Sequence, residues 1–425
     1  DMAYTDFIAA IDLGTSHMVG MVGTKNATGA LSIIAYEVEN SGTCIRRGCV
    51  YNVKETASKI KRLILKLENK LGGTKIGQVY VGLGGQSLRS IEHTVCKVLG
   101  TEGVVTEEII DSLYQECKDY RPDMLTVLDV VSPSYFLDDK PESNPVGVPC
   151  SRIEARYKLI VGRPSLKLNI VNSISEQAKI EIAGILVSPL ALGDVVLSDN
   201  EKDLGCALIG FGAGVTTISV YKGGKLASLS VVPFGGNLIT KDITNLRVVE
   251  SEAERLKITY GSAKADRDND MTIQVSLADG MGLREIKLAE LNGVIEARMD
   301  EILENVYARL EATGLMSVLG AGIVITGGGA ALKNLPAVMS ERLKMEVRYS
   351  AVRKGVVASG DLVVASNPEY AVAVGLLAKG TKNCALYIPP KPEPKIEPVV
   401  EPEPTVEPTP EPEPVKEKPK KEKKK

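Results

Sequence analysis

The sequence has no tryptophan, only two histidines and few aromatic residues of any kind. Aromatic residues make up 4% of the 425 residues, so we expect cores built from Ile, Leu, Val and Ala. With only His17 and His93 present, a histidine-rich metal site or a His-based catalytic triad is not expected. An excess of one charge is also lacking: 51 Lys and Arg stand against 54 Asp and Glu, a net charge of −3, which argues against a general nucleic-acid-binding protein.

Paired cysteines and long apolar runs are absent too. The seven cysteines are scattered, none forms a CxxC motif, and no apolar signal segment is visible, so we expect reduced thiols and a cytosolic protein. Cys44 and Cys49 could pair or bind a metal, but free thiols are the prediction. The longest uncharged stretch, Leu204 to Tyr221, contains four glycines, which favours two strands around a turn over a membrane-spanning helix.

The last part of the chain differs in composition from the rest. Residues 389–425 hold 12 of the 22 prolines, alternate them with Glu and Val, and end in KEKPKKEKKK. Because this segment has no apolar stripe of helical period, we expect a disordered linker and a folded body that ends near Ile388.

One repeat organises the body. Residues 7–38 have the pattern of three strands joined by two glycine-containing turns, and residues 206–234 have the same layout. Each unit is followed by helices and another strand, and the clearest helix, Lys54 to Leu71, has one apolar stripe and ends at two glycines. Two similar halves predict two α/β lobes, each built on a twisted sheet, with a crevice between them that suits a small ligand.

Three glycine-containing turns are expected to meet in that crevice. The first, Asp12-Leu13-Gly14-Thr15-Ser16, offers N–H groups and hydroxyls to a polyphosphate and a carboxylate to a hydrated Mg²⁺. The second, GFGAGVTT at 210–217, lies at the same place in the second repeat. The third, IVITGGGA at 323–330, precedes a helix with Pro336 near its start, which would aim helix amides at a phosphate or ribose.

Each turn alone has a purely structural explanation, as a tight hairpin or as close packing. The three together, two of them in a duplicated frame, indicate nucleotide binding. The chain has neither GxxxxGK[ST] nor GxGxxG after its first strand, so the P-loop and Rossmann classes are disfavoured.

The order of the motifs DLGTS, GFGAGVTT, EAERLK and TGGGA resembles the actin/Hsp70/hexokinase superfamily and, more narrowly, the FtsA family of bacterial cell-division actin homologues. The narrower resemblance is carried by SNPVG (143–147), LGCALIGFGAG, VVPFGGNLITKDI (231–243), EAERLKITYGSA (252–263), AGIVITGGGAALKNLPAV (321–338) and EYAVAVGLLAKG (369–380).

The resemblance implies an α/β, two-lobed actin-like ATPase fold with duplicated sheet domains and an FtsA-type insert subdomain. The implied parts are a first lobe (1A) of 7–83, 163–197 and 361–388, the insert (1C) of 84–162, a second lobe (2A) of 198–235 and 314–360, a small subdomain (2B) of 236–313, and the linker of 389–425.

The resemblance also assigns residues to ATP or ADP. They are Asp12, Gly14, Thr15 and Ser16 in the first loop, Gly212, Ala213, Gly214, Val215 and Thr216 in the second, Gly235, Gly236 and Asn237 after it, Glu254 and Lys257 beside the adenine and ribose, and Gly327, Gly328 and Gly329 at the adenosine. Asp12 is further assigned to Mg²⁺ through ATP. Because residues 254 and 257 lie three apart on one helix face, an ordinary surface ion pair is the alternative for them.

One position departs from the family pattern. The second loop of FtsA proteins usually opens with Asp, whereas aligning the two repeats of this chain sets Gly210 opposite Asp12. The hydroxyl that usually follows the last glycine is displaced to Thr216, because Val215 stands in its place. Losing a carboxylate from a Mg²⁺ shell removes charge stabilisation that phosphoryl transfer needs, so we predict that ATP binds and is hydrolysed very slowly. No catalytic residue is identified.

Partners follow from the resemblance as well. FtsA proteins bind the C-terminal peptide of FtsZ through the small subdomain, form filaments and meet later divisome proteins through the insert. In the helix expected at Leu288 to Thr313, Arg298 matches a family FtsZ-contact arginine, and a solvated arginine is the alternative.

FtsA proteins also attach to the inner membrane face by a C-terminal amphipathic helix. This chain has the linker but no such helix, and its basic end could touch anionic lipid only electrostatically. The expected location is cytoplasmic and peripheral at the division site.

Two other classes of function stay open. An active ATPase of the chaperone or sugar-kinase kind would carry a peptide-binding β domain or a sugar-binding insert, and neither is visible. A shape-determining or pilus-assembly actin relative is the other class. The NPVG insert and the linker argue against the shape-determining protein MreB, while the pilus-assembly relative stays open.

Overall fold

A computed structural model describes residues 6–276, 280–358, 362–386 and 410–415 of the chain. The chain divides into two compact units, Asp1–Tyr387 and Ile388–Lys425. In the second unit, residues 410–415 are exposed and have no regular secondary structure. The rest of the linker expected at 389–425 lies outside the described residues.

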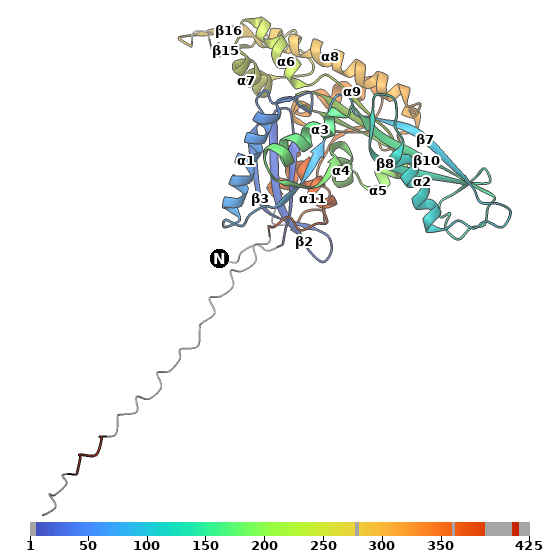
Figure 1. Cartoon of the computed structure of the whole chain (residues 1–425). Coiled ribbons are helices and arrows are strands. Elements are labelled where there is room, and N and C mark those ends of the chain that lie inside the picture. The colour runs from blue at the N-terminus through green and yellow to red at the C-terminus, as the bar shows by residue number, and fades with distance from the viewer. Residues whose placement is uncertain (1–5, 277–279, 359–361, 387–409, 416–425) are drawn as a thin grey trace, which may run out of the picture. The chain divides into compact units, whose positions relative to one another are not determined.

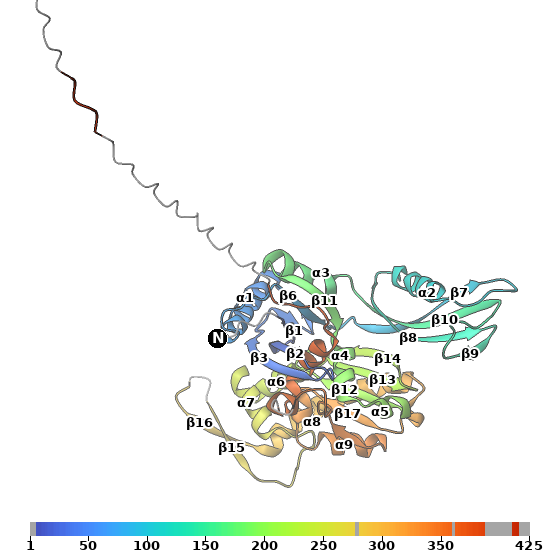
Figure 2. The same ribbon diagram turned by 90° about the horizontal axis from the view of Figure 1, so that it is seen from below.

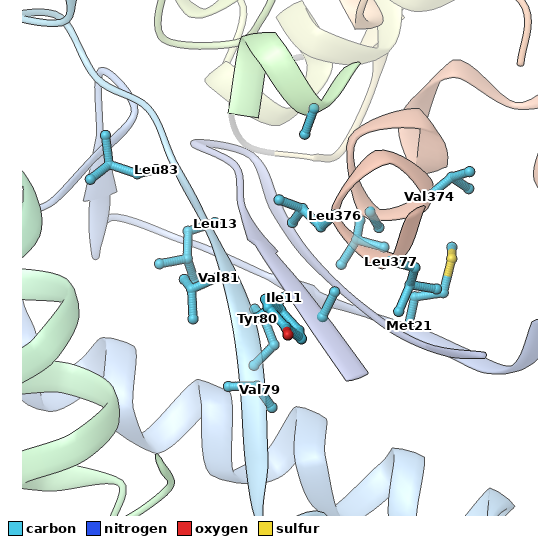
Figure 3. Packing of buried hydrophobic residues seen from close by; sticks show 14 of the residues in the cluster. Ile11, Leu13, Met21, Val79, Tyr80, Val81, Leu83, Val374, Leu376 and Leu377 are labelled. Atoms are coloured by element: carbon cyan, nitrogen blue, oxygen red, sulfur yellow. The ribbon is translucent and has the colours of Figure 1, made fainter. Parts of the chain in front are cut away.

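The first lobe is built on a five-stranded sheet with the order β11-β6-β1-β2-β3. Three antiparallel strands come first, and two later strands extend the sheet in parallel, β6 beside β1 and β11 beside β6. The strands are β1 (Ile8–Leu13), β2 (His17–Lys25), β3 (Leu31–Asn40), β6 (Gln78–Leu83) and β11 (Glu181–Val187). Helix α1 (Val53–Lys70) packs on one face of the sheet and α11 (Ala371–Lys379) on the other, where α4 (Ser188–Val196) contacts α11 (Figure 3).

The second lobe repeats this topology. Its sheet has the order β14-β13-β12-β17-β18, again with three antiparallel strands followed by two parallel ones. The strands are β12 (Cys206–Phe211), β13 (Thr216–Lys222), β14 (Lys225–Val232), β17 (Ile323–Thr326) and β18 (Val347–Tyr349). The uncharged stretch from Leu204 to Tyr221 forms strands β12 and β13 around a glycine-containing turn, as predicted. The duplication predicted from the sequence is confirmed.

Residues 84–162 form a separate small sheet. It is antiparallel, with the order β7-β10-β8-β9, and α2 (Glu107–Asp119) packs on it (Figure 1). Its strands are β7 (Arg89–Val98), β8 (Thr126–Leu137), β9 (Lys140–Glu142) and β10 (Arg152–Gly162). The segment has its own hydrophobic core and also touches the edge strand β14 of the second lobe, where the Leu229 N–H donates to Ser90 Oγ at 2.8 Å (Figure 2).

Residues 236–313 are mainly helical. They contain α6 (Gly236–Ile243), the 3₁₀ turn η2 (Thr244–Leu246), α7 (Glu250–Tyr260), the hairpin of β15 (Thr272–Ser276) and β16 (Leu283–Lys287), and α8 (Leu288–Ala312). Six apolar side chains at helical spacing along α8 are buried: Leu291, Ile295, Met299, Ile302, Val306 and Leu310. They form the packed face of this helix, which was predicted over Leu288 to Thr313.

The remaining elements are short. They are the hairpin of β4 (Ile45–Arg46) and β5 (Cys49–Val50), α3 (Ser165–Val171), the π-helix η1 (Asn172–Gln177), α5 (Asp199–Leu204), the 3₁₀ turns η3 (Met316–Val318), η4 (Gly328–Ala331) and η5 (Pro368–Tyr370), α9 (Leu335–Leu343) and α10 (Leu362–Ser366). None of the helices in the described ranges combines the length and the apolar content that crossing a bilayer requires.

Helix α1 shows how the sequence sets an element. The Asn52 side chain accepts a hydrogen bond from the Glu55 N–H and caps the first turn. Beyond the last turn, Gly72 and Gly73 take the positive φ values that end a helix cheaply, and the Gly73 N–H returns to the Glu68 carbonyl oxygen at 2.9 Å. The observed range is one residue earlier at each end than the predicted 54–71.

The core is almost entirely aliphatic, as the composition predicts. Phe7 and Phe211 are the only aromatic residues among the largest fully buried side chains. The cluster centred on the first sheet includes side chains of β1, β6 and α11 (Figure 3) and continues onto one face of the second sheet at Leu208 and Val324. The opposite face of the second sheet, with Ile209 and Ile325, belongs to a second cluster. The two lobes therefore share one continuous packed region.

One part of the expected division differs. Residues 352–358 were expected in the second lobe, but Val352, Val356 and Val357 pack against the first-lobe cluster. The Leu31 N–H donates to the Val356 carbonyl oxygen at 2.8 Å, which ties this segment to the edge strand β3. Residues 352–358 therefore contact the first sheet through their backbone, a pairing that composition alone does not reveal. The other expected boundaries of the parts remain predictions.

All seven cysteines are free in the structure, as predicted. Five of them are buried, and neither Cys44 nor Cys49 forms a disulfide. Among the described residues, no group of His, Cys, Asp or Glu is arranged to hold a metal ion on its own.

Candidate functional site

The first loop joins β1 to β2. Pairing of Leu13 with Met18 closes a four-residue turn. Gly14 is required in this turn, because a Cβ there would lie 2.4 Å from the carbonyl oxygen of His17. The Ser41 hydroxyl donates to the Gly14 carbonyl oxygen at 2.6 Å and fixes the loop from the side.

Asp12 lies one residue before Leu13, which closes this turn, and is half-buried. Its carboxylate forms no hydrogen bond or ion pair with any residue of the described ranges. Burial raises the pKa of Asp12 from 3.8 to about 7. A Cβ at Gly82, on the neighbouring strand β6, would lie 2.4 Å from Ser188 Oγ and 3.4 Å from Asp12 Oδ1, so a side chain at residue 82 would crowd this side of the carboxylate. A desolvated carboxylate without a partner is the kind of group that a cation stabilises most.

The second loop repeats the first in its backbone. Phe211 pairs with Thr216 to close another four-residue turn, and a Cβ at Gly212 would lie 2.9 Å from the Val215 carbonyl oxygen. The shared requirement for glycine at the first turn position shows that the two loops have the same local geometry.

The register of the two hairpins confirms the departure inferred from the sequence. Asp12 pairs with Val19 across the first hairpin, and Gly210 pairs with Thr217 across the second. Gly210 therefore occupies the position of the carboxylate. A Cβ at Gly210 would lie 2.6 Å from Thr217 Oγ1, so a threonine hydroxyl fills part of the space that a side chain at 210 would need.

The two threonines that follow the second loop, Thr216 and Thr217, have surroundings that the sequence did not predict. Thr216 is fully buried, and its hydroxyl donates to the Phe234 carbonyl oxygen at 2.9 Å, so only its backbone is left for the nucleotide contact expected of it. Thr217 was missed, although it is half-buried beside Gly210. The sequence shows two threonines after the loop, but only the pairing of β12 with β13 shows that Thr217 is the one beside Gly210.

The first and second loops touch across the lobes. A Cβ at Gly214 would lie 2.6 Å from Thr15 Oγ1 and 2.9 Å from the Cα of Arg47. Glycine at 214 is thus the condition for this close approach. Ser16 is exposed beside it, and Val215 is half-buried.

The segment that begins α6 is hydrogen-bonded to the second loop. The Gly236 N–H donates to the Gly212 carbonyl oxygen and the Asn237 N–H to that of Ala213, each at 2.9 Å. A Cβ at Gly235 would lie 2.5 Å from the Ala213 carbonyl oxygen. All three residues assigned to the nucleotide after the loop therefore lie against it.

Helix α7 contributes the pair at 254 and 257. Lys257 Nζ lies 2.7 Å from Glu254 Oε2 and donates to the Gly236 carbonyl oxygen at 3.2 Å and to Thr240 Oγ1 at 2.9 Å. The pair is thus an ion pair, as one alternative has it, and Lys257 also reaches the backbone that supports the second loop. A place beside adenine and ribose stays a prediction.

The third loop follows β17. Gly327 has φ of 87°, and a Cβ there would lie 2.4 Å from the Phe211 carbonyl oxygen. Gly329 also packs on Phe211, whereas a Cβ at Gly328 would meet no atom within 4 Å. The helix expected after the glycines, with Pro336 in its first turn, is α9, but the 3₁₀ turn η4 comes first. The amides next to the glycines are therefore those of η4.

Arg298 is not part of this cluster. Its guanidinium is bound to Asp242 of α6, with Nε–Oδ2 at 2.5 Å and Nη2–Oδ1 at 3.2 Å, and to Glu301 at 2.5 Å. Hydrogen bonding to Asp242 raises the pKa of Arg298. The side chain expected to project freely is thus neutralised within the chain, and sequence reasoning missed Asp242 as its partner because the two lie 56 residues apart.

Two hollows lie elsewhere. One, of about 730 Å³, is lined by residues of α3, η1 and β11 and of the segment between η1 and β11. The other, of about 360 Å³, lies beside residues 264–268. Neither includes a residue of the three glycine loops, so the candidate site is defined by its loops and their contacts.

The duplicated sheets and the three glycine loops define an actin-like ATPase fold. Solved structures agree: a chain of the PilM–PilN type IV pilus biogenesis complex superposes with a TM-score of 0.61 at 17% identity, covering 87% of this chain and 97% of that one. MreB5 of Spiroplasma citri bound to ADP gives a TM-score of 0.50 at 14% identity, covering 87% and 95%. The MamK double helical filament gives 0.50 at 11%, covering 87% and 97%. At these identities the likeness shows the fold alone.

Sequence comparison is more specific. Residues 207–375 match the family model described as cell division protein FtsA. Cell division protein FtsA of Porphyromonas gingivalis is 39% identical over 382 residues, covering 89% of this chain and 79% of the relative. That of Bacillus subtilis is 32% identical over 392 residues, covering 91% and 86%. The chain belongs to the FtsA family and is a cell-division protein with an actin-like fold.

Proposed function

We propose that this chain binds ATP, assembles into filaments and links FtsZ to the cytoplasmic membrane, with little ATP hydrolysis. The observation that carries the nucleotide part is the unbroken contact between the predicted loops: first to second at Gly214, second to α6 and Lys257, and second to third at Phe211. Segments far apart in the sequence thus form one surface of backbone groups and small residues, which suits phosphates. MreB5, of similar fold, is described as bound to ADP, which supports the same ligand class.

Asp12 fits a magnesium ion that accompanies the nucleotide. The carboxylate is half-buried, has no partner among the described residues and has a pKa of about 7, so a cation would relieve its desolvation. Oxygen donors are what Mg²⁺ prefers, and the ion usually binds through one or two carboxylates together with phosphates. When bound, Mg²⁺ would neutralise phosphate charge. Asp12 would hold it, and the loop amides would hold the phosphates.

Slow hydrolysis follows from the second loop. Gly210 offers no carboxylate, and its neighbour Thr217 offers a neutral hydroxyl. The paired hairpins therefore carry one carboxylate where two equivalent positions exist. Phosphoryl transfer depends on charge stabilisation at this point, so binding without brisk turnover is the expected behaviour.

The FtsZ contact is proposed on the surface of α6 and α8. A bidentate guanidinium suits a peptide carboxylate, but Asp242 already occupies the Arg298 fork. An incoming peptide must therefore compete with Asp242. Replacing Asp242 by Asn should strengthen FtsZ binding, and Arg298→Glu should abolish it. Arg309→Glu, at an exposed position of the same helix, is the matched control.

Filament formation, divisome contacts through residues 84–162 and membrane attachment are proposed from the family. The self-assembly part is supported by the fold likeness to MamK, which forms a double helical filament. The proposed location is the inner face of the cell membrane at the division site.

The decisive experiment is calorimetric titration of the full chain with ATP and ADP, with and without Mg²⁺, followed by a phosphate-release assay. We expect binding that Mg²⁺ strengthens and very slow phosphate release. No affinity for either nucleotide would remove the basis of the proposal, and brisk Mg²⁺-dependent turnover would contradict its slow-hydrolysis part. Pull-down of FtsZ, with and without ATP, tests the partner, and failure in both conditions would contradict the linkage.

A further inference from the structure

A short hairpin lies against both of the loops assigned to phosphate. It consists of β4 and β5, joined by the two-residue turn of Arg47 and Gly48. Both turn residues have positive φ, 48° and 73°, as a type I′ turn requires. Ile45 and Val50 are buried in the first-lobe core. The tip is therefore anchored through its own strands.

The tip touches both lobes. The Gly48 N–H donates to Thr15 Oγ1 at 2.9 Å, in the first loop. A Cβ at Gly214, in the second loop, would lie 2.9 Å from the Cα of Arg47. The tip and the two loops thus meet at one point. Because Thr15 Oγ1 accepts from Gly48, the hydrogen of the Thr15 hydroxyl is left to donate to a ligand oxygen.

Arg47 brings a charge to this point. Its side chain is exposed, and Nη1 donates to Gln86 Oε1 at 3.3 Å, in the segment after β6. Within the described residues, no carboxylate forms an ion pair with Arg47. Lys257, by contrast, already has Glu254 as its partner at 2.7 Å. Arg47 therefore offers an uncompensated positive charge at the contact of the two loops.

We propose that the tip of this hairpin is a fourth element of the nucleotide site, and that Arg47 binds the terminal phosphates of a nucleoside triphosphate. The proposal rests on the proposed nucleotide binding, since it takes the first and second loops as the phosphate loops. Asp12 adds negative charge where the phosphates would lie, so a guanidinium with no carboxylate partner complements them. Its planar fork suits phosphate oxygens, and such charge-assisted bonds are stronger than neutral ones.

The test compares two neighbouring arginines by titration of the full chain. Arg47→Gln removes the charge at the tip, and Arg46→Gln is the matched control, because the exposed Arg46 stacks on the Tyr51 ring at 3.6 Å. Arg47→Lys keeps the charge. Each variant is titrated with ATP, ADP and adenosine, and its thermal unfolding is recorded to verify folding.

We expect Arg47→Gln to weaken ATP binding by about tenfold or more, ADP binding by less and adenosine binding not at all. Arg47→Lys should recover part of the ATP affinity, and Arg46→Gln should match the unmodified chain. If Arg47→Gln binds ATP as the unmodified chain does, or loses all three ligands equally, the role of Arg47 is refuted while nucleotide binding stands. If the unmodified chain binds no nucleotide, both proposals fail together.

Discussion

The first and second glycine loops have the same backbone and different side chains. In both, a strand pair closes a four-residue turn whose first residue must be glycine. The first loop carries a carboxylate and two hydroxyls at Asp12, Thr15 and Ser16, whereas the equivalent positions of the second are Gly210, Ala213 and Gly214. The first lobe therefore places polar side chains at these three positions, and the second lobe places only backbone groups and one methyl group there.

This difference shows which part of a duplicated unit is constrained. The central strands of both repeats, β1 and β12, are buried along nearly their whole length and paired on both sides, so packing fixes their pattern. The turn residues at the strand ends are constrained by the local backbone geometry, by contacts between the lobes and by any ligand that binds there. Glycine at residue 214 is required by the contact with Thr15, so the second loop has no hydroxyl at the position equivalent to Ser16. Substitutions in the loops can remove or restore this asymmetry.

The largest effect is expected from Asp12→Asn, which makes the two loops alike in having no carboxylate. Because a cation bound at a half-buried site loses its charged ligand, the Mg²⁺-dependent affinity for ATP should fall by about a hundredfold. Calorimetry with and without Mg²⁺ measures this. An unchanged Mg²⁺ dependence would show that the first lobe does not supply the metal ligand.

The same variant should change how stability depends on pH. The folded chain holds a proton on Asp12 up to about pH 7, whereas the unfolded chain releases it near the ordinary pKa of 3.8. The contribution of Asp12 to the free energy of unfolding therefore falls as pH rises through this window, by on the order of 2–3 kcal/mol between pH 5 and 8. Urea unfolding without nucleotide or Mg²⁺ should show a smaller loss for Asp12→Asn over that range. Parallel pH profiles of the two proteins would contradict the burial of this carboxylate.

A smaller effect is expected from Gly214→Ala, which separates the loops without adding charge. Its Cβ would lie 2.6 Å from Thr15 Oγ1 and 2.9 Å from the Arg47 Cα, so the lobes must move apart. We expect ATP affinity to fall by about tenfold through loss of loop positioning. In the control Gly293→Ala, in α8, the new Cβ meets no atom within 4 Å, and stability should rise by about 0.5–1 kcal/mol with nucleotide binding unchanged. Equal nucleotide affinities for the two variants would argue against contact between the loops in the bound state.

Much of the fold could be predicted because its signals are local. The apolar stripe of α1 and the glycines after it gave that helix to within one residue, and the repeated strand pattern gave both sheets. The hairpin of β4 and β5 was missed because two-residue strands produce no periodic pattern. The backbone contact of residues 356 and 358 with Leu31 was not predicted, because the two segments lie far apart in the sequence.

The candidate site divides in the same way. Glycine spacing marks the loops, because glycine is needed wherever backbones approach closely, and the structure brings those loops together. The environment of individual polar side chains was not predictable. The Thr216 hydroxyl donates to the Phe234 carbonyl oxygen, and the Arg298 guanidinium donates to the Asp242 carboxylate. Both partners are brought into place by tertiary packing. Arg47 was missed for the same reason, since only the folded chain sets it against Gly214.

The smallest effect is expected from restoring the missing carboxylate. Gly210→Asp recreates in the second loop what Asp12 provides in the first, and it should raise the slow ATP hydrolysis by a few-fold. The gain from the single change is limited, because the new Cβ would lie 2.6 Å from Thr217 Oγ1 and the threonine must turn away. The double variant Gly210→Asp with Thr217→Ala removes that obstacle and should hydrolyse ATP faster than either single variant, as measured by phosphate release at saturating Mg²⁺ and ATP. If the double variant binds ATP but releases phosphate no faster than the unmodified chain, the asymmetry of the two loops is not what limits hydrolysis.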